Sequence, residues 1–307
     1  MKKHYTDSFG VEWKEFPDVQ LDSENQYSWN ISEARLELVL GFPLEFLKDK
    51  SVIELGCGPG RFSEHFIKYC KDLTIVDSSD AINYNSTAKH KNCTSHRKDF
   101  LDQSFIKENS NKFDIVFCRG VIQHTEDRFI AIKSLFEYAK IQPAGLVIFD
   151  VYPRRKSDLM YFWRNVLPKF ITVDKFIEIL NNNLELLGNV HLFFKKLRAR
   201  FFFKYFQKFL PFINIFVMPD FLKDHPGIKN KKHEHRLIVS LLVDAIYSHY
   251  DKPMSMHEIN SALAKIGQKY YSVDSNRCIV RCKRNEFFTE SEFKETKNGI
   301  QLIQTTK

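Results

Sequence analysis

Three glycines at positions 56, 58 and 60 form a loop whose bare main-chain N–H groups can contact a ligand. A short β-branched run, Val52 to Leu55, precedes the loop, and apolar residues at helical spacing follow from Phe62. A strand, a glycine loop and a helix in this order place a ligand at the carboxyl end of a parallel strand. The spacing is G-x-G-x-G, whereas dinucleotide-binding folds have G-x-G-x-x-G.

An acidic residue that can bind a sugar ends the next expected strand. Residues 71–76 (K-D-L-T-I-V) predict that strand, and Asp77 follows it directly. A carboxylate at this position can accept two hydrogen bonds from a ribose diol. The alternative is that Asp77 only caps the helix that follows it.

The elements that must position these residues continue as alternating strands and helices. Residues 95–102 contain Asp99 followed by Phe100, and residues 113–118 (F-D-I-V-F-C) predict a buried strand. We expect a helix over 128–140 and another strand over 146–150 (L-V-I-F-D). Such alternation is typical of an α/β fold with a parallel sheet.

Taken together, E-L-G-C-G-P-G at 54–60, V-D-S-S-D-A-I from residue 76, Asp99-Phe100 and R-G-V-I-Q-H from residue 119 resemble the class I S-adenosylmethionine-dependent methyltransferases. The resemblance implies a Rossmann-like, doubly wound seven-stranded sheet, mostly parallel with an antiparallel terminal hairpin, and S-adenosylmethionine as cofactor. A generic βα repeat that binds NAD(P), or no ligand, is the alternative, and Cys57 could serve packing alone. The cofactor-binding residues implied are Glu54, Gly56, Cys57, Gly58, Gly60, Asp77, Ser78, Asp99, Phe100 and Arg119.

The implied reaction is an in-line displacement at a sulfonium methyl. Because this donor is already activated, the enzyme must mainly align the acceptor, exclude water and take up a proton. His124, just beyond the strand over 113–118 (the fourth of the implied sheet), is the first candidate for the base. Asp150 and Tyr152, at and just after the end of the strand over 146–150 (the fifth), are the alternatives. His124 could equally be a core histidine. No Asn/Asp-Pro-Pro-Tyr/Phe or Pro-Cys follows the fourth strand, which argues against methylation of nucleic-acid bases by the usual routes.

The remaining segments surround this core. The segment F-G-V-E-W-K-E-F-P at 9–17 resembles that of a methyltransferase subgroup found among bacterial cell-surface glycan enzymes. A helix is expected from Ser32, its N-cap, to Leu40, with Gly41 as its stop. We divide the chain into five segments: a lead-in with a cofactor-covering helix (1–50), a cofactor-binding core (51–152), a large, mainly helical insert that forms the acceptor or lid region (153–252), a C-terminal part of the core (253–285) and a polar tail (286–307). In the C-terminal part we expect a helix over 255–267 and strands near 269–273 and 278–283.

The insert is basic and rich in phenylalanine. Residues 153–232 hold 16 Lys and Arg against 6 Asp and Glu, and 13 of the 29 phenylalanines. Over 191–210, cations recur every four residues beside an aromatic face (Lys196, Arg200, Lys204, Lys208). Such a helix can lie in a membrane interface, approach RNA phosphates, or pack its aromatic face on the core.

Composition indicates the redox state of the cysteines and the location of the protein. The net charge is +8, and the six cysteines lack paired spacing, so we expect reduced thiols and no metal site. No apolar h-region follows the N-terminus, and we expect a cytoplasmic protein that can contact the inner face of the membrane peripherally. Three functions stay open: O-methylation of a small molecule or glycan, including a lipid-linked one; tRNA modification; and a non-catalytic binding module with this fold.

Overall fold

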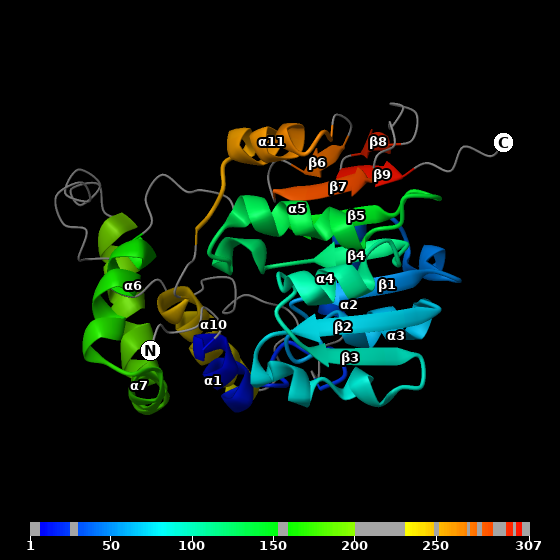
Figure 1. The fold of residues 1–307 in the computed structure, drawn as a ribbon. Helices are drawn as coiled ribbons and strands as arrows, with labels where there is room; N and C mark the ends of the chain where they lie inside the picture. Colours follow the sequence, from blue (N-terminus) through cyan, green and yellow to red (C-terminus); the bar gives the residue numbers. More distant parts are fainter. Residues whose placement is uncertain are drawn as a thin grey trace. The chain divides into compact units, whose positions relative to one another are not determined.

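The computed structural model (Figure 1) describes residues 7–24, 30–152, 159–199, 231–248, 252–268, 271–274, 278–284, 293–296 and 299–302. The chain forms two compact units. The first comprises Met1–Glu24, Asn30–Arg154 and Tyr250–Lys307, and the second comprises Asn25–Trp29 and Arg155–His249.

A seven-stranded sheet forms the centre of the first unit. Its strand order is β3-β2-β1-β4-β5-β7-β6; β1 to β5 are parallel, and β7 is antiparallel to both β5 and β6. This arrangement confirms the predicted mostly parallel sheet with an antiparallel terminal hairpin. The strands are β1 Ser51–Leu55, β2 Asp72–Asp77, β3 Cys93–Arg97, β4 Ile115–Cys118, β5 Leu146–Asp150, β6 Ser272–Asp274 and β7 Ile279–Lys283.

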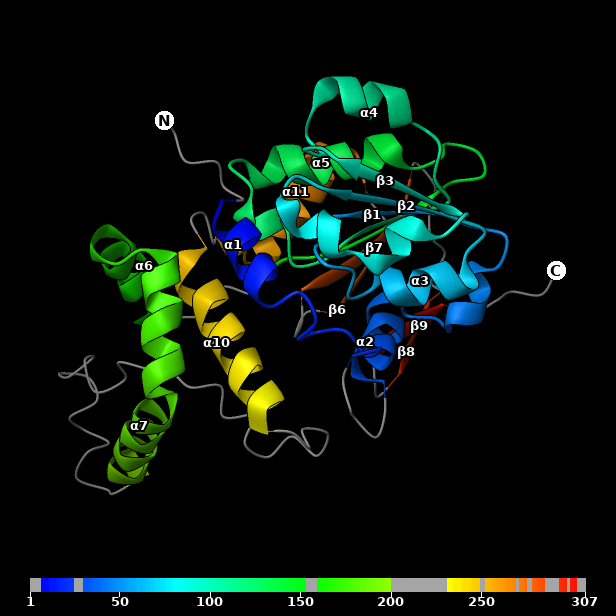
Figure 2. The same cartoon turned by 90° about the horizontal axis from the view of Figure 1, so that it is seen from below.

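Helices cover both faces of this sheet, as Figure 2 shows. Alternate residues of one strand therefore enter different cores: Ile53 of β1 lies in the cluster beneath α4, α5 and α11, and Val52 in the cluster with α2 and α3. Burial on both faces explains why β1, β4 and β5 are mainly apolar runs. The helices are α2 Ile31–Leu40, α3 Ser63–Tyr69, α4 Gln103–Asn109, α5 Arg128–Tyr138 and α11 Met256–Lys265.

Local capping sets several helix ends. Helix α11 has a complete capping box, in which Ser255 and Glu258 satisfy each other's backbone N–H groups. Helix α2 ends at Gly41, as predicted, with φ of 82°. The predicted N-cap at Ser32 is wrong: Asn30 occupies that position, and the Ser32 hydroxyl instead donates to the carbonyl of Gln20 at 3.0 Å.

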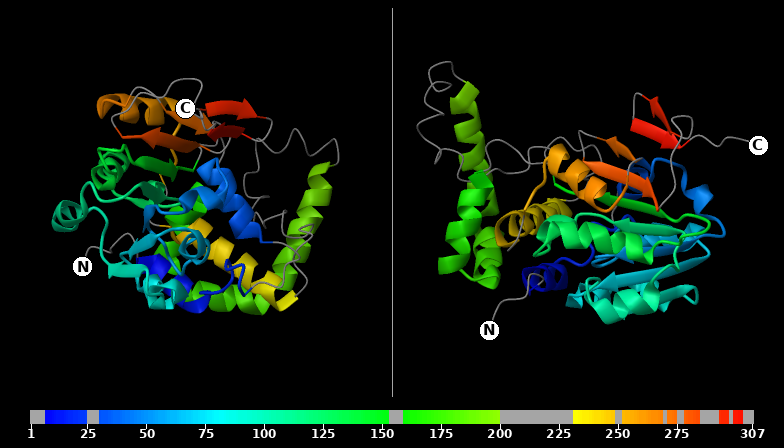
Figure 3. Two further views of the ribbon diagram at one scale, coloured as in Figure 1. Left: turned by 90° about the vertical axis from the view of Figure 1, so that its right-hand side faces the viewer. Right: turned by 45° about the horizontal axis from the view of Figure 1, so that its top comes forward.

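Short elements connect these helices and strands. The lead-in contains α1 Asp7–Glu15, which packs against the 3₁₀ helix η2. The expected polar tail contains the hairpin β8 Phe293–Thr296 and β9 Gly299–Leu302, whose register pairs Phe293 with Leu302 (Figure 3). The 3₁₀ helices are η1 Leu44–Leu47, η2 Asp80–Tyr84, η3 Ser86–Lys89 and η4 Ile122–His124.

The second unit is helical in its described part, as expected for the insert. Helix α10 (Lys231–Tyr247) packs on α6 (Leu159–Phe170) and α7 (Val173–Ala199). The predicted amphipathic helix at 191–210 is helical through Ala199, where α7 ends; the rest of it and its side chains lie outside the described residues. Among the helices that the structure describes, none combines the length and apolar composition needed to cross a membrane.

Candidate active site

The glycine loop after β1 is fastened to the end of the neighbouring strand β2. The backbone N–H groups of Gly56 and Cys57 donate to the carbonyl of Val76 at 2.7 and 3.1 Å. The N–H of Gly58 donates to Oδ2 of Asp77 at 2.8 Å. Because β1 and β2 are parallel, the loop and Asp77 meet at the carboxyl edge of the sheet, where the sequence predicts a ligand.

The three glycines serve different purposes, although all have positive φ. A Cβ on Gly56 would lie 2.3 Å from Cγ2 of Val121, and one on Gly60 would lie 2.6 Å from Oδ1 of Asn85. These two positions are therefore filled by the protein itself. A Cβ on Gly58 would meet only Nε1 of Trp13, at 3.9 Å, so the space that a ligand can enter lies above Gly58.

Asp77 is a partly exposed, well-oriented acceptor at this edge. Its Oδ1 accepts hydrogen bonds from the N–H and hydroxyl of Ser79 at 2.8 and 2.7 Å. Burial raises the pKa of Asp77, while the bonds from Ser79 and Gly58 oppose that rise. Ser79, whose hydroxyl accepts from Ala81, caps the following helix; the alternative role of Asp77 as that cap is therefore wrong.

Two predicted cofactor residues, Glu54 before the loop and Cys57 within it, have buried side chains. The Glu54 side chain is buried, and its Oε2 accepts a hydrogen bond from the Ser63 hydroxyl at 2.5 Å. Burial raises the pKa of Glu54 to about 8. Cys57 is also buried and packs in the core cluster with α2 and α3, as the packing alternative expects. Ser78, next to Asp77, is partly exposed.

The third predicted pair follows β3. Oδ1 of Asp99 accepts from the N–H of Leu101 at 2.9 Å, and the residue is partly exposed. The side chain of Phe100 is buried in the core under α4 and α5, and its carbonyl accepts from the Tyr138 hydroxyl. Asp99 therefore presents the polar side of this pair, and Phe100 anchors the turn.

At the ends of β4 and β5, an ion pair joins the two strands. Nε of Arg119 lies 3.2 Å from Oδ2 of Asp150, and Oδ1 of Asp150 accepts from the N–H of Gly120 at 2.6 Å. Burial raises the pKa of Asp150, and the Arg119 charge and the Gly120 bond oppose this. Both carboxylate oxygens thus have partners.

His124 and Tyr152 come together at the same strand ends. Their rings meet edge to face, with centroids 5.7 Å apart; His124 is buried, and Tyr152 is 38% exposed. Gln123, which the sequence argument overlooked, is fully buried, and its side-chain amide makes no hydrogen bond within the described part of the chain. A buried amide without a partner is unusual, and only the tertiary structure reveals it.

Arginines add positive charge beside the glycine loop. The guanidinium groups of Arg61 and Arg119 lie 5.2 and 5.1 Å from the centroid of the Phe62 ring. Arg61 donates to the side chains of Gln20 and Ser32 in the lead-in. Burial lowers the pKa of Arg61 to about 9, and the neighbouring charges of Arg35 and Arg119 contribute. The edge therefore offers anionic and cationic groups side by side.

This arrangement fits the predicted cofactor. Gly58 leaves an open side that a Cβ would enter, and Asp77 presents its carboxylate next to it. S-adenosylmethionine carries a ribose diol, which a carboxylate can bind through two hydrogen bonds. Trp13 of α1 borders the same space.

Comparison with known proteins agrees with these features. A family model described as a methyltransferase domain matches residues 30–187. A ubiquinone biosynthesis O-methyltransferase of Coxiella burnetii is 28% identical over 130 residues, which are 40% of this chain and 55% of that protein. Malonyl-[acyl-carrier protein] O-methyltransferase 1 of Ilyobacter polytropus is 26% identical over 157 residues, 48% of this chain and 57% of that protein. The chain thus spans little more than half the length of these relatives.

Two solved structures are similar over part of the fold. Phosphoethanolamine N-methyltransferase 1 of Haemonchus contortus has a TM-score of 0.37 and 17% identity, covering 52% of this chain and 40% of that one. The N-methyltransferase NodS of Bradyrhizobium japonicum has a TM-score of 0.35 and 21% identity, covering 47% of this chain and 74% of that one.

Proposed function

We propose that this chain, which belongs to the methyltransferase domain family, transfers the methyl group of S-adenosylmethionine to an oxygen atom of a small-molecule acceptor. The observation that carries the proposal is the glycine loop held by Asp77 through the Gly58 N–H, with open space above Gly58. The two curated relatives named above, both called O-methyltransferases, support oxygen as the nucleophile.

The cofactor supplies an activated methyl group; the protein must supply orientation and accept a proton. Asp77 would hold the ribose and Asp99 the adenine side, since both are partly exposed at the carboxyl edge. Trp13 and α1 would exclude water above the loop.

His124 is the proposed general base. It ends the 3₁₀ helix η4 that comes after β4, and its contact with the Tyr152 ring limits its orientation. A histidine titrates near neutral pH, where it can take the proton of an acceptor hydroxyl. Asp150 is less suited to this role because Arg119 and Gly120 already engage its oxygens.

Two measurements test the function. Titration calorimetry of the full chain with S-adenosylmethionine should show one-to-one binding, and its absence would leave the non-catalytic binding module. Transfer of a radiolabelled methyl group should then be followed on a panel of a catechol, an acyl thioester with a free carboxylate, a sugar and tRNA. Label on an oxygen of a small molecule supports the proposal; label only on tRNA or on an amino nitrogen contradicts it.

The narrower acceptor hypotheses belong to the same panel. Label on a sugar would favour the glycan acceptor implied by residues 9–17. A peripheral membrane contact through 191–210 is tested by sedimentation with anionic liposomes, with and without charge reversal at four cations of that segment: Lys196, Arg200, Lys204 and Lys208. Equal, negligible sedimentation of both proteins excludes it.

A further inference from the structure

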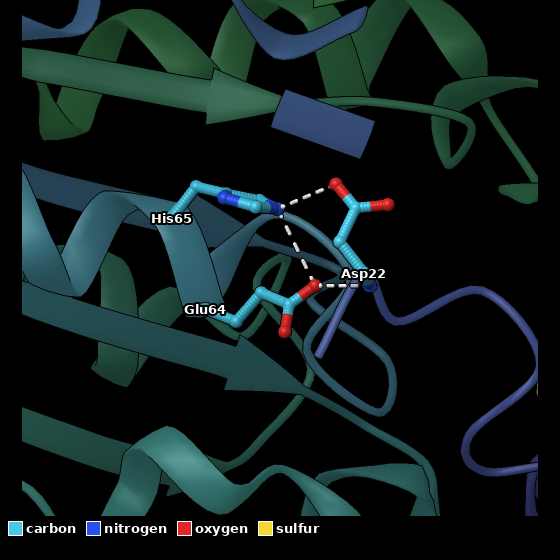
Figure 4. A group of neighbouring side chains, drawn as sticks. All are labelled: Asp22, Glu64 and His65. Atoms are coloured by element: carbon cyan, nitrogen blue, oxygen red, sulfur yellow. Dashed lines mark hydrogen bonds and ion pairs between the residues drawn. The ribbon is translucent and has the colours of Figure 1, made fainter. Parts of the chain in front are cut away.

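We propose that Asp22, Glu64 and His65 form a binding site for a divalent metal ion of the zinc class. Figure 4 shows His65 and Glu64 projecting from α3 toward Asp22 of the lead-in. The site is separate from the carboxyl-edge residues described above and does not depend on methyl transfer. Its role would be to fasten the lead-in to the helix that follows the glycine loop.

The ligand atoms have the spacing that a small metal ion requires. Nε2 of His65 lies 3.1 Å from Oδ2 of Asp22 and 3.3 Å from Oε1 of Glu64. Tetrahedral zinc with bonds of about 2.0–2.1 Å places its ligands about 3.3 Å from one another. One nitrogen and two carboxylate oxygens are ligands that zinc accepts, and one position is left for water.

The direction of the imidazole is the second observation. The side chain of His65 is 1% exposed, and neither of its ring nitrogens makes a hydrogen bond with any residue that the structure describes. Nε2 nevertheless faces two carboxylates at close range, as the dashed lines in Figure 4 mark. A metal ion bound to this nitrogen would therefore lie within reach of both carboxylates.

Backbone donors fix both carboxylates. The N–H groups of Ser32 and Glu33 donate to the two oxygens of Asp22 at 3.0 and 2.9 Å. Those of Asp22 and Ser23 donate to the two oxygens of Glu64 at 2.6 and 3.3 Å. Each oxygen keeps a further lone pair. Hydrogen bonds of this kind to ligand oxygens orient a metal site and tune it.

Charge also favours an ion here. A metal ion binds the deprotonated imidazole, and the two buried carboxylates beside it then carry two negative charges, which a divalent cation neutralises. The competing occupant is a proton. Burial alone would lower the pKa of His65, but Asp22 and Glu64 raise it to about 9, so an imidazolium between the carboxylates is the state that metal must displace.

The test uses the full chain and Zn²⁺ as the probe. After removal of metal with a chelator, the wild type is dialysed against Zn²⁺, and bound zinc is measured by mass spectrometry. His65→Gln is the test variant, and His90→Gln, at an exposed histidine, is the matched control. We expect one zinc per chain in the wild type and in His90→Gln, and none in His65→Gln.

Thermal unfolding gives a readout that needs no activity and no variant. Added Zn²⁺ should raise the Tm of the wild type by several degrees, and Mg²⁺ at the same concentration should not. Zinc that remains on His65→Gln would show that the metal binds elsewhere on the chain. That result, or a wild type that holds no zinc and shows no change in Tm, overturns the proposal in favour of an imidazolium bridge.

Discussion

Replacing Gly56 by alanine should destabilise the first unit far more than the same change at Gly58. Both residues have left-handed φ, 74° and 52°, which costs an alanine about 1 kcal/mol at either position. The surroundings differ: at Gly56 the new Cβ would lie 2.3, 3.0 and 3.2 Å from Cγ2, Cγ1 and Cβ of Val121. Rotation of the Val121 side chain cannot relieve all three contacts.

Overpacking of this kind costs about 1–3 kcal/mol, so the total for Gly56→Ala is roughly 2–4 kcal/mol. For a unit of this size, that free energy lowers the Tm by about 2–4 °C per kcal/mol. Scanning calorimetry should therefore separate Gly56→Ala clearly from Gly58→Ala. Gly58→Ala should instead weaken S-adenosylmethionine binding, because its Cβ enters the open side of the loop.

A double variant isolates the contact. Val121→Ala removes two of the three crowded atoms, so Gly56→Ala combined with Val121→Ala should lose less stability than the two single changes added together, by about 1–3 kcal/mol. Strict additivity, or equal losses for Gly56→Ala and Gly58→Ala, would refute this division of roles.

Four further changes probe other parts of the first unit. Asp77→Asn should weaken S-adenosylmethionine binding about 10-fold or more in calorimetry, since a hydrogen bond to a charged group contributes about 1.5–3 kcal/mol, whereas Asp72→Asn at the start of the same strand should not. Burial raises the Glu54 pKa from 4.5 to about 8, so the folded chain keeps a proton that the unfolded chain loses, and stability falls as pH rises through that range. The Tm of Glu54→Gln relative to that of the wild type should therefore rise between pH 4.5 and about 8 and be constant above it. A Tm difference that does not change with pH would contradict this. His124→Gln should lower kcat about 10²- to 10⁴-fold and flatten its pH profile. His257→Gln, at an exposed histidine, is the control and should keep the wild-type kcat. An unchanged kcat of His124→Gln from pH 6 to 9 removes the base role. Ser255→Ala should cost about 1 kcal/mol of stability in thermal unfolding, because the Glu258 N–H loses its acceptor in the α11 capping box. No loss would mean that the Ser255 hydroxyl is dispensable there.

The elements that the sequence predicted correctly are those whose information is local. Strands β1, β4 and β5 are short, mainly apolar runs buried on both faces, and the glycines that follow β1 have positive φ. The capping box of α11 likewise depends on residues three apart. The C-terminal core part could be recognised for the same reason.

The parts that could not be predicted depend on distant residues. Glycine is required at 56 by Val121, which precedes η4, and at 60 by Asn85, which lies between η2 and η3. The motif by itself does not record these neighbours and suggests ligand contact for all three glycines. Ser32 has the side chain of a good N-cap, but Gln20 engages its hydroxyl. The Asp22–Glu64–His65 cluster joins the lead-in to α3, a pairing that no local spacing records.

The ion pair between Arg119 and Asp150 makes Asp150 a poor candidate for the proposed general base. Asp150 ends β5 beside β4, and its two oxygens bind Arg119 and the N–H of Gly120. To remove a proton from an acceptor, this carboxylate would have to break a charged contact in a buried position, which is costly. Asp150 therefore acts best by holding the turn after β4, the turn that leads to His124. Under the proposed function, this leaves proton removal to His124, because a histidine has an ordinary pKa near neutrality.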